Sequence, residues 1–205
     1  IALRDALAIC RNQSDPDETA WALYALANAL ENEGKLEEAI STQKECLMIR
    51  RKTHGEEYPS TGDDYTQLGR FLASTTNRID EGLNYLRQGL DIMKRTQGEG
   101  KNYRQVHAEV SLARALSKLG KLEEAEIHFR AAVTIARSQG ESGHPDLPGF
   151  IVTLARFFRD QGKLAEARPL AEEAVAFCQR QPDRVNRSTR ERSFATLREV
   201  LTGLG

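Results

Sequence analysis

The sequence contains few cysteines and prolines and no long apolar run. Its 205 residues include three cysteines, six prolines and one tryptophan. No apolar run approaches the roughly 20 residues that a helix needs to span a bilayer, so we expect no membrane contact. The 29 basic and 30 acidic residues give a net charge of −1, which argues against a global attraction to nucleic acid or to an anionic membrane.

The cysteines are too far apart and too few to suggest a disulfide framework. Cys10, Cys46 and Cys178 are odd in number, and each lies in an apolar stretch with helical spacing. Buried free thiols in a reducing compartment are therefore expected. We accordingly predict a cytoplasmic location.

Signals for catalysis or for a cofactor are also missing. None of the four histidines is near a cysteine, and Glu124 and His128, one helical turn apart, lack a third metal ligand. The segment Gly98–Lys101 has neither the flanking strand nor the spacing of a phosphate loop. The sequence therefore predicts neither an enzyme, nor a metal site, nor a cofactor.

A repeated segment is the strongest positive signal. Gly34-Lys35-Leu36-Glu37-Glu38-Ala39 returns at residues 120–125 and 162–167, and a divergent copy occupies residues 77–82. The copies begin at residues 34, 77, 120 and 162, so they are spaced 43, 43 and 42 residues apart. A fixed period of this size indicates a stack of similar helical units, each contacting its neighbours.

Each unit is predicted to contain two helices joined by the glycine turn. A bulky and a small residue recur side by side in the first helix, at Leu26-Ala27, Leu68-Gly69, Leu112-Ala113 and Leu154-Ala155. Small residues recur in the second helix at 39, 82, 125 and 167, and again at 46, 89, 132 and 174. Small side chains let helix backbones approach closely, and the turn glycine can adopt the left-handed conformation that ends the first helix.

The period divides the chain into four complete units between two half-units. The expected ranges are a preceding second helix at 1–12, repeats at 19–54, 61–97, 103–139 and 146–181, and a capping or further first helix at 188–205. The chain opens in mid-helix, so we expect it to be a single array cut from a longer protein. Arg198 replaces the small residue in the last segment, which favours a solvent-facing cap.

These small-residue positions resemble the tetratricopeptide repeat. The longer period, the Pro59 and His144-Pro145 signals and the proline early in the second helix (Pro169) are similar to the kinesin-light-chain type. The resemblance covers essentially the whole chain. It implies an all-α fold, a right-handed superhelical array of antiparallel helix pairs, and a role as a protein-binding scaffold.

The resemblance also implies a binding groove lined by the first helices. The position after each small residue faces this groove. In the third and fourth repeats, a further basic residue lies about one helical turn beyond that position. The peptide-binding residues expected there are Tyr24, Asn28, Arg70, Arg114, Lys118, Arg156 and Arg159. Because arginine forks match carboxylates and phosphates, an extended acidic or phosphorylated peptide is the expected ligand.

Two alternatives remain open for these side chains. The arginines could be solvated surface residues paired with neighbours such as Asp160 or Glu109. Trp21 could join Tyr24 as an apolar anchor, or could pack against residues 1–10.

The resulting prediction is a protein–protein interaction scaffold with an acidic peptide or protein partner. The alternative is a structural or regulatory arm of a larger signalling protein, such as a kinase or a nucleotide-switch ATPase. Such an arm would dock within its own chain or self-associate. Nucleic-acid binding is not expected, since the net charge is −1 and the groove offers little aromatic stacking surface.

Overall fold

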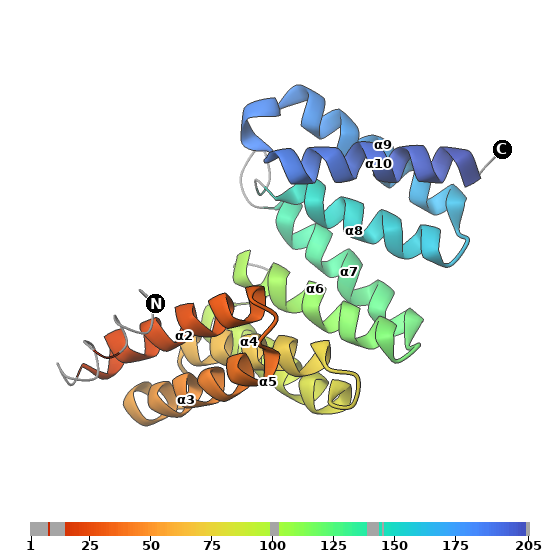
Figure 1. Cartoon of the computed structure of the whole chain (residues 1–205). Helices are drawn as coiled ribbons and strands as arrows, with labels where there is room; N and C mark the ends of the chain where they lie inside the picture. The colour runs from red at the N-terminus through yellow and green to blue at the C-terminus, as the bar shows by residue number, and fades with distance from the viewer. Residues whose placement is uncertain (1–7, 9–14, 99–102, 139–143, 145, 204–205) are drawn as a thin grey trace. The chain divides into compact units, whose positions relative to one another are not determined.

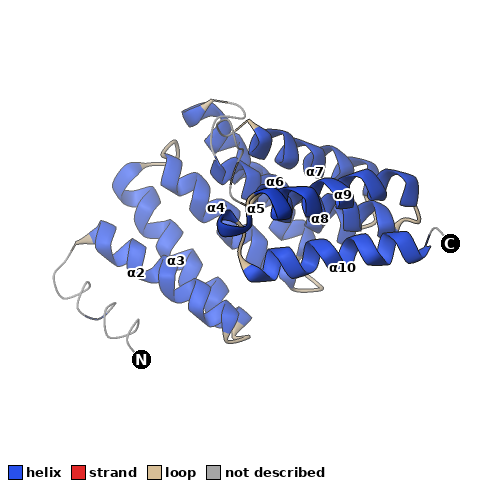
Figure 2. Cartoon of the chain, turned by 90° about the horizontal axis from the view of Figure 1, so that it is seen from above, coloured by secondary structure: helices blue, strands red, loops and turns tan. Residues whose placement is uncertain are grey.

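The computed structural model describes residues 8, 15–98, 103–138, 144 and 146–203, and these residues form helices joined by short loops (Figures 1 and 2). The helices are α2 (Pro16–Asn32), α3 (Leu36–His54), α4 (Pro59–Ser74), α5 (Ile79–Gln97), α6 (Tyr103–Lys118), α7 (Leu122–Arg137), α8 (Leu147–Asp160), α9 (Leu164–Arg180), the short 3-10 helix η1 (Pro182–Arg184) and α10 (Arg187–Gly203). None of the described residues forms a strand. None of the described helices has the length and hydrophobicity needed to cross a bilayer.

The turn glycines adopt the predicted left-handed conformation. Gly34, Gly120 and Gly162 have φ of 77°, 72° and 73°. After Gly34, the Lys35 N–H reaches back to the Leu30 carbonyl over 2.8 Å, and the same bond after Gly162 is 2.9 Å long. These bonds satisfy carbonyls that the helix end leaves without partners, so the glycine both ends the first helix and starts the turn.

The chain divides into two compact units. Of the described residues, unit 1 comprises 8, 15–98 and 114–120, and unit 2 comprises 103–113, 121–138, 144 and 146–203. Helix α6 therefore contributes its first part to unit 2 and its end to unit 1. The division into repeat units given above stays a prediction. Apart from residue 8, the half-unit expected at 1–12 lies outside the described residues.

Unit 1 has its closest helix contact between α4 and α5. Glycine occupies all three small positions here, at Gly69, Gly82 and Gly89. A Cβ atom on Gly69 would lie 2.7 Å from the Gly82 carbonyl oxygen, and one on Gly89 would lie 2.7 Å from the Gly62 carbonyl oxygen. The two backbones therefore touch directly, and the absent side chains make room for this contact.

Unit 2 is built around α8, which is buried along most of its length. Phe150, Ile151, Leu154 and Phe158 are buried, and Phe157 stacks at a tilt against Phe129 of α7 with ring centroids 5.0 Å apart. Helix α10 packs on α8 and α9 through a face that includes Thr189, Ser193, Thr196 and Val200.

Asn186 caps the N-terminus of α10. The Thr189 N–H is accepted by Asn186 Oδ1 at 2.8 Å, one residue before the helix begins at Arg187. Arg198 is exposed, in keeping with a solvent-facing position.

Candidate functional site

The side chains expected to bind a ligand lie on the first helices of their repeats, but they divide between the two units. Unit 1 holds Tyr24 and Asn28 on α2, Arg70 on α4, and Arg114 and Lys118 at the end of α6. Unit 2 holds Arg156 and Arg159 on α8. The geometry of each group is therefore taken within its own unit.

In unit 1, Asn28 connects α2 with α4 through both ends of its amide. Its Nδ2 donates to the Tyr24 carbonyl over 2.9 Å. Its Oδ1 accepts from Gln67 Nε2, and it lies 3.4 Å from Arg70 Nη2. The amide thus holds the two helices in register and places Arg70 at the edge of a polar network.

Arg70 is compensated by an acidic side chain that the sequence interpretation did not include. Its Nη1 forms an ion pair with Glu31 of α2 over 2.5 Å, and both side chains are partly buried. Glu31 lies one helical turn after Asn28, so the spacing from a predicted site residue could have revealed it. A ligand carboxylate that binds Arg70 has to compete with Glu31.

Lys118 has a structural contact with the end of α4. Its Nζ donates to the Ala73 carbonyl over 2.7 Å. Ala73 lies in the last turn of α4, where carbonyls lack helical partners and the helix dipole favours a cation. The ammonium group therefore stabilises a helix terminus, which accounts for a cation at this position without a ligand.

In unit 2, Arg159 is also paired. Its Nη2 lies 2.6 Å from Asp160 Oδ1, and its Nη1 forms an ion pair with Glu199 of α10. The expected pairing with Asp160 is thus present. Glu109, the other acid considered as an arginine partner, contacts His128 Nδ1 over 2.5 Å and is only 2% exposed.

Arg114 and Arg156 are the exposed arginines of the predicted set. Both follow a buried alanine, Ala113 and Ala155 respectively, on a first helix. The helix backbone therefore directs both guanidinium groups away from the core of their units. Arginines in this position can offer two parallel N–H groups to a carboxylate or a phosphate.

Trp21 is exposed at the start of the predicted site. Its side chain is 54% exposed, its ring meets Tyr24 edge-on at 6.3 Å, and the Arg50 guanidinium lies 4.6 Å from the ring centroid. The alternative contact with residues 1–10 lies outside the described residues. Trp21 and Tyr24 thus form an aromatic pair on α2.

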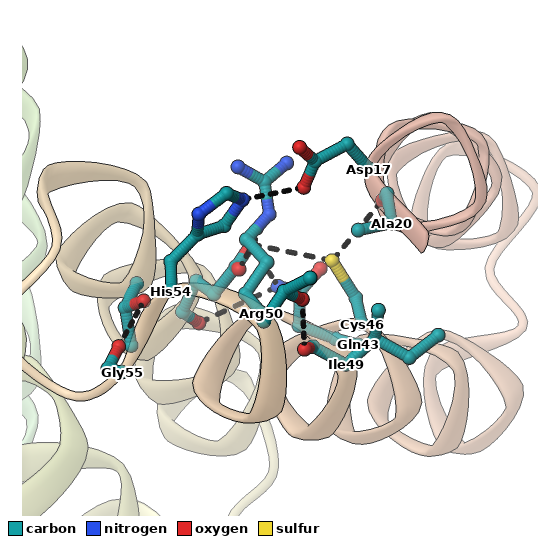
Figure 3. A network of polar contacts seen from close by, with 11 residues as sticks. Asp17, Ala20, Gln43, Cys46, Ile49, Arg50, His54 and Gly55 are labelled. Carbon is teal, nitrogen blue, oxygen red and sulfur yellow. Dashed lines mark hydrogen bonds and ion pairs between the residues drawn. The ribbon is translucent and has the colours of Figure 1, made fainter. Parts of the chain in front are cut away.

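Sequence reasoning missed a buried polar cluster between α3 and α4. Figure 3 shows its α3 members Gln43, Cys46 and Arg50. Arg50 Nε lies 2.9 Å from Asp64 Oδ2, and both side chains are buried. Gln43 Nε2 lies 3.1 Å from Asp64 Oδ1, while the Cys46 sulfur points toward the Ala20 carbonyl at 3.1 Å. Arg50 lies near the C-terminal end of α3, where a cation is common. Its partner Asp64, however, is a buried residue of α4.

Burial changes the acidity of two members of this cluster. It raises the pKa of Asp64 to about 6, although the Arg50 guanidinium acts in the opposite direction. It also raises the pKa of Cys46 to about 12, with a further contribution from the Asp64 charge. Cys46 and Cys178 are buried free thiols, which confirms the expectation for these two residues. Cys10 lies outside the described residues.

No candidate metal site occurs in the described part of the chain. No three His, Cys, Asp or Glu residues there lie close enough together to hold a metal ion. His128, considered above as a partner of Glu124, instead forms its short contact with Glu109.

Solved structures of similar fold include kinesin-light-chain-like proteins. A kinesin-light-chain-like protein of Podosopora anserina with nearly identical TPR-like repeats is 24% identical, with 94% of this chain and 89% of that chain covered and a TM-score of 0.75. BtubC (BKLC) from P. vanneervenii is 17% identical, with coverages of 88% and 72% and a TM-score of 0.75. A Rap protein complexed with Competence and Sporulation Factor is 14% identical, with coverages of 97% and 57% and a TM-score of 0.77.

These likenesses concern the fold. Together with the helix pairs described above, they confirm the predicted class, all-α with the superhelical repeat architecture. No curated protein matches the sequence. Family models for the tetratricopeptide repeat match residues 18–95, 110–139 and 151–180. Since these matches cover more than half of the chain, the chain belongs to the tetratricopeptide repeat family.

Proposed function

We propose that this protein–protein interaction scaffold binds an extended acidic peptide segment along its first helices. The tetratricopeptide repeat fold is that of non-catalytic interaction scaffolds, so a protein partner follows from the family. The acidic character of the ligand rests on one observation. An arginine follows the small residue of the first helix in three successive repeats, at Arg70, Arg114 and Arg156.

Arg114 of unit 1 and Arg156 of unit 2 each supply a charge contact in this proposal. Both are exposed, and neither has to leave the core of its unit to reach a ligand. A guanidinium group binds a carboxylate through two parallel hydrogen bonds, which fixes direction as well as charge. Electrostatic attraction of this kind raises the association rate and weakens as salt is added.

At Arg70 and Arg159, a ligand has to displace an acidic side chain of the chain. A ligand carboxylate at Arg70 replaces Glu31, and one at Arg159 replaces Glu199. Exposed ion pairs contribute about 0–1 kcal/mol, so such an exchange changes the binding free energy little. A ligand with several negative charges can make such an exchange at both arginines, whereas a ligand with one charge can do so at only one. The exchange therefore favours ligands with several negative charges.

A protein of similar fold supports the idea that such an array can hold a ligand. The Rap protein noted above was crystallised with Competence and Sporulation Factor. The aromatic pair of Trp21 and Tyr24 would add apolar contacts at the α2 end of the proposed surface.

Affinity selection from a random peptide library, carried out at low and at high salt, tests the proposal. We expect enrichment of acidic peptides at low salt and its loss at high salt. The double substitution Arg114→Glu and Arg156→Glu should then weaken binding of a selected peptide at least about tenfold, which corresponds to about 1.4 kcal/mol. Unchanged affinity in this double variant would show that the arginines do not form the site.

A matched control keeps the charge change but moves it elsewhere. Arg168→Glu and Arg187→Glu alter two exposed arginines, on α9 and α10, which form ion pairs with acidic residues one turn away. We expect this control to leave peptide affinity within about twofold, because each such pair contributes only about 0.3–0.5 kcal/mol to its own helix. A loss equal to that of the first double variant would instead indicate a nonspecific effect of net charge.

A third variant tests the competition at Arg70. Glu31→Gln removes the internal carboxylate while keeping an amide of similar size. The affinity for an acidic peptide should rise by about two- to fivefold, the equivalent of about 0.4–1 kcal/mol. If the affinity does not change, Arg70 lies outside the binding surface.

A further inference from the structure

Helix α10 packs on α8 and α9 through one face and leaves its other face exposed (Figure 2). Exposed residues recur along that face at steps of four, three, four and three positions, and they are Arg187, Glu191, Phe194, Arg198 and Leu201. This spacing is that of the contact stripe between two helices that coil around each other. We call these five residues the α10 stripe.

The corresponding positions of α8 are buried. Phe194 lies 43 residues after Ile151, and Arg198 lies 43 residues after Ala155. Both of these α8 side chains are fully buried, whereas Phe194 is 45% exposed and Arg198 is also exposed. The α10 stripe therefore occupies positions that the preceding first helix uses for packing.

The charged residues of the α10 stripe determine what kind of helix can cover it. A covered arginine needs an acidic group opposite, and Arg198 forms no ion pair with another described residue. Glu191 lies seven positions before Arg198, and its ion pair with Arg187 is exposed to solvent. A matching helix therefore has to present an acid opposite Arg198 and a base opposite Glu191.

A second copy of α10 presents both groups at the required spacing. In an antiparallel pair with a two-fold axis, each position before the axis faces the position equally far after it. With the axis beside Phe194, Glu191 of each copy faces Arg198 of the other copy. A parallel pair would instead place like charges opposite each other at both positions, so the charges specify the antiparallel direction.

We propose that the α10 stripe is a self-association surface, which joins two copies of this chain through an antiparallel pair of α10 helices. The two Phe194 rings form the apolar centre, and two symmetry-related pairs of Glu191 with Arg198 flank it. Leu201, which is 44% exposed, adds apolar surface toward each end of the contact. Because each copy contributes a single helix, the dimer is weak, with an expected dissociation constant of about 10–300 µM.

Sedimentation equilibrium at chain concentrations from about 10 µM to about 1 mM measures this association. We expect the average mass to rise from that of one chain toward that of two. Glu191→Arg and Arg198→Glu, made separately, should each weaken the dimer at least about tenfold, because symmetry replaces two attractive pairs with two repulsive ones. A wild-type chain that stays monomeric up to about 1 mM would overturn the proposal.

Combining the two substitutions tests the pairing itself. The Glu191→Arg chain presents two cations and the Arg198→Glu chain presents two acids, so an equimolar mixture should form mixed dimers although neither chain dimerises well alone. A chain that carries both substitutions exchanges the two charges and should dimerise within about threefold of the wild-type affinity. If neither the mixture nor the double variant restores association, Glu191 does not face Arg198 and the proposal is refuted.

Matched controls make the same changes in net charge on α9. Arg168 and Glu172 form an exposed ion pair one turn apart, so Arg168→Glu and Glu172→Arg, made separately, should leave the dimer affinity within about twofold. Thermal unfolding followed by circular dichroism checks that every variant folds. Equal losses from the α9 and α10 variants would refute the α10 stripe as the interface. Arg114→Glu with Arg156→Glu should leave the dimer unchanged, so failure of the proposed peptide surface is distinguishable from failure of this proposal.

Discussion

At the scale of single residues, the most unusual environment is that of Asp64. Its carboxylate is fully buried between α3 and α4, where it contacts Arg50, Gln43 and Cys46. Removing a carboxylate from water favours its neutral form, and the nearby guanidinium favours its charged form. Burial is the larger influence here, because the pKa rises to about 6.

This environment predicts how stability changes with pH. Since the pKa of Asp64 is higher in the folded state than the ordinary value of 3.8, the folded state binds the proton more tightly between these two values. The contribution of Asp64 to stability is therefore present below about pH 4 and is lost as pH rises to about 6. The loss is on the order of 3 kcal/mol.

Comparison with Asp64→Asn isolates this contribution, because the amide does not titrate. Urea unfolding of both proteins between pH 4 and pH 7 gives the difference in unfolding free energy. We expect the advantage of the wild-type protein over Asp64→Asn to shrink as pH rises through this window. A difference that grows with pH would mean that the Arg50 charge outweighs burial.

At the scale of elements, the direct backbone contact between α4 and α5 predicts a large effect of one methyl group. Gly89→Ala places a Cβ atom 2.7 Å from the Gly62 carbonyl oxygen, a distance that real Cβ contacts do not reach. The helices must separate, and such overpacking costs about 1–3 kcal/mol. Chemical denaturation followed by circular dichroism should show this loss.

Gly149→Ala is the matched control on α8. The nearest heavy atom to its added Cβ is 3.6 Å away, which is an ordinary contact distance. Alanine restricts the unfolded chain more than glycine does, so a gain of about 0.4–1 kcal/mol is expected. Equal destabilisation by both substitutions would show that close helix packing does not explain the effect at Gly89.

The helices and turns were predictable from the sequence because their signals are local. The turn glycines and the paired Leu-Gly or Leu-Ala positions repeat at a fixed spacing, and Gly34 takes the conformation that the pattern predicts. Arg50 and Asp64 were not predictable in this way. Each is a charged residue at a helical position, and its burial depends on a partner in the other helix.

The candidate site was predictable in register but not in its pairing. Helical spacing places Arg114 and Arg156 on exposed faces, since each follows a buried alanine. The expected partner of Arg159, Asp160, is its neighbour in the sequence. The other partners of Arg70 and Arg159, which are Glu31 and Glu199, lie about one repeat away along the chain. Such contacts depend on how helices pack and on long side-chain conformations, neither of which periodicity specifies.

At the scale of the whole molecule, the repeat architecture predicts that damage stays local. In repeat proteins, stability is approximately the sum of unit stabilities and contacts between neighbours. Gly89→Ala should therefore accelerate amide hydrogen exchange in α4 and α5, by about 30-fold for a loss of about 2 kcal/mol. Helices α8 and α9, which belong to unit 2, should change much less.

Hydrogen exchange with mass spectrometry resolves these segments in one experiment. Peptides from residues 59–97 report on α4 and α5, and peptides from residues 147–180 report on α8 and α9. The same acceleration in both sets would indicate that the two units unfold together as a single cooperative structure. Gly149→Ala again serves as the control, since it is expected to slow exchange near α8.

The buried thiol of Cys46 has a practical consequence. Only the thiolate reacts with alkylating reagents, and a pKa of about 12 leaves roughly one molecule in 10⁵ ionised at neutral pH. The same sulfur lies against the Ala20 carbonyl, inside the contact between α2 and α3. Alkylation therefore requires these helices to separate. The rate at which iodoacetamide modifies Cys46 measures how often unit 1 opens, with no label introduced into the chain.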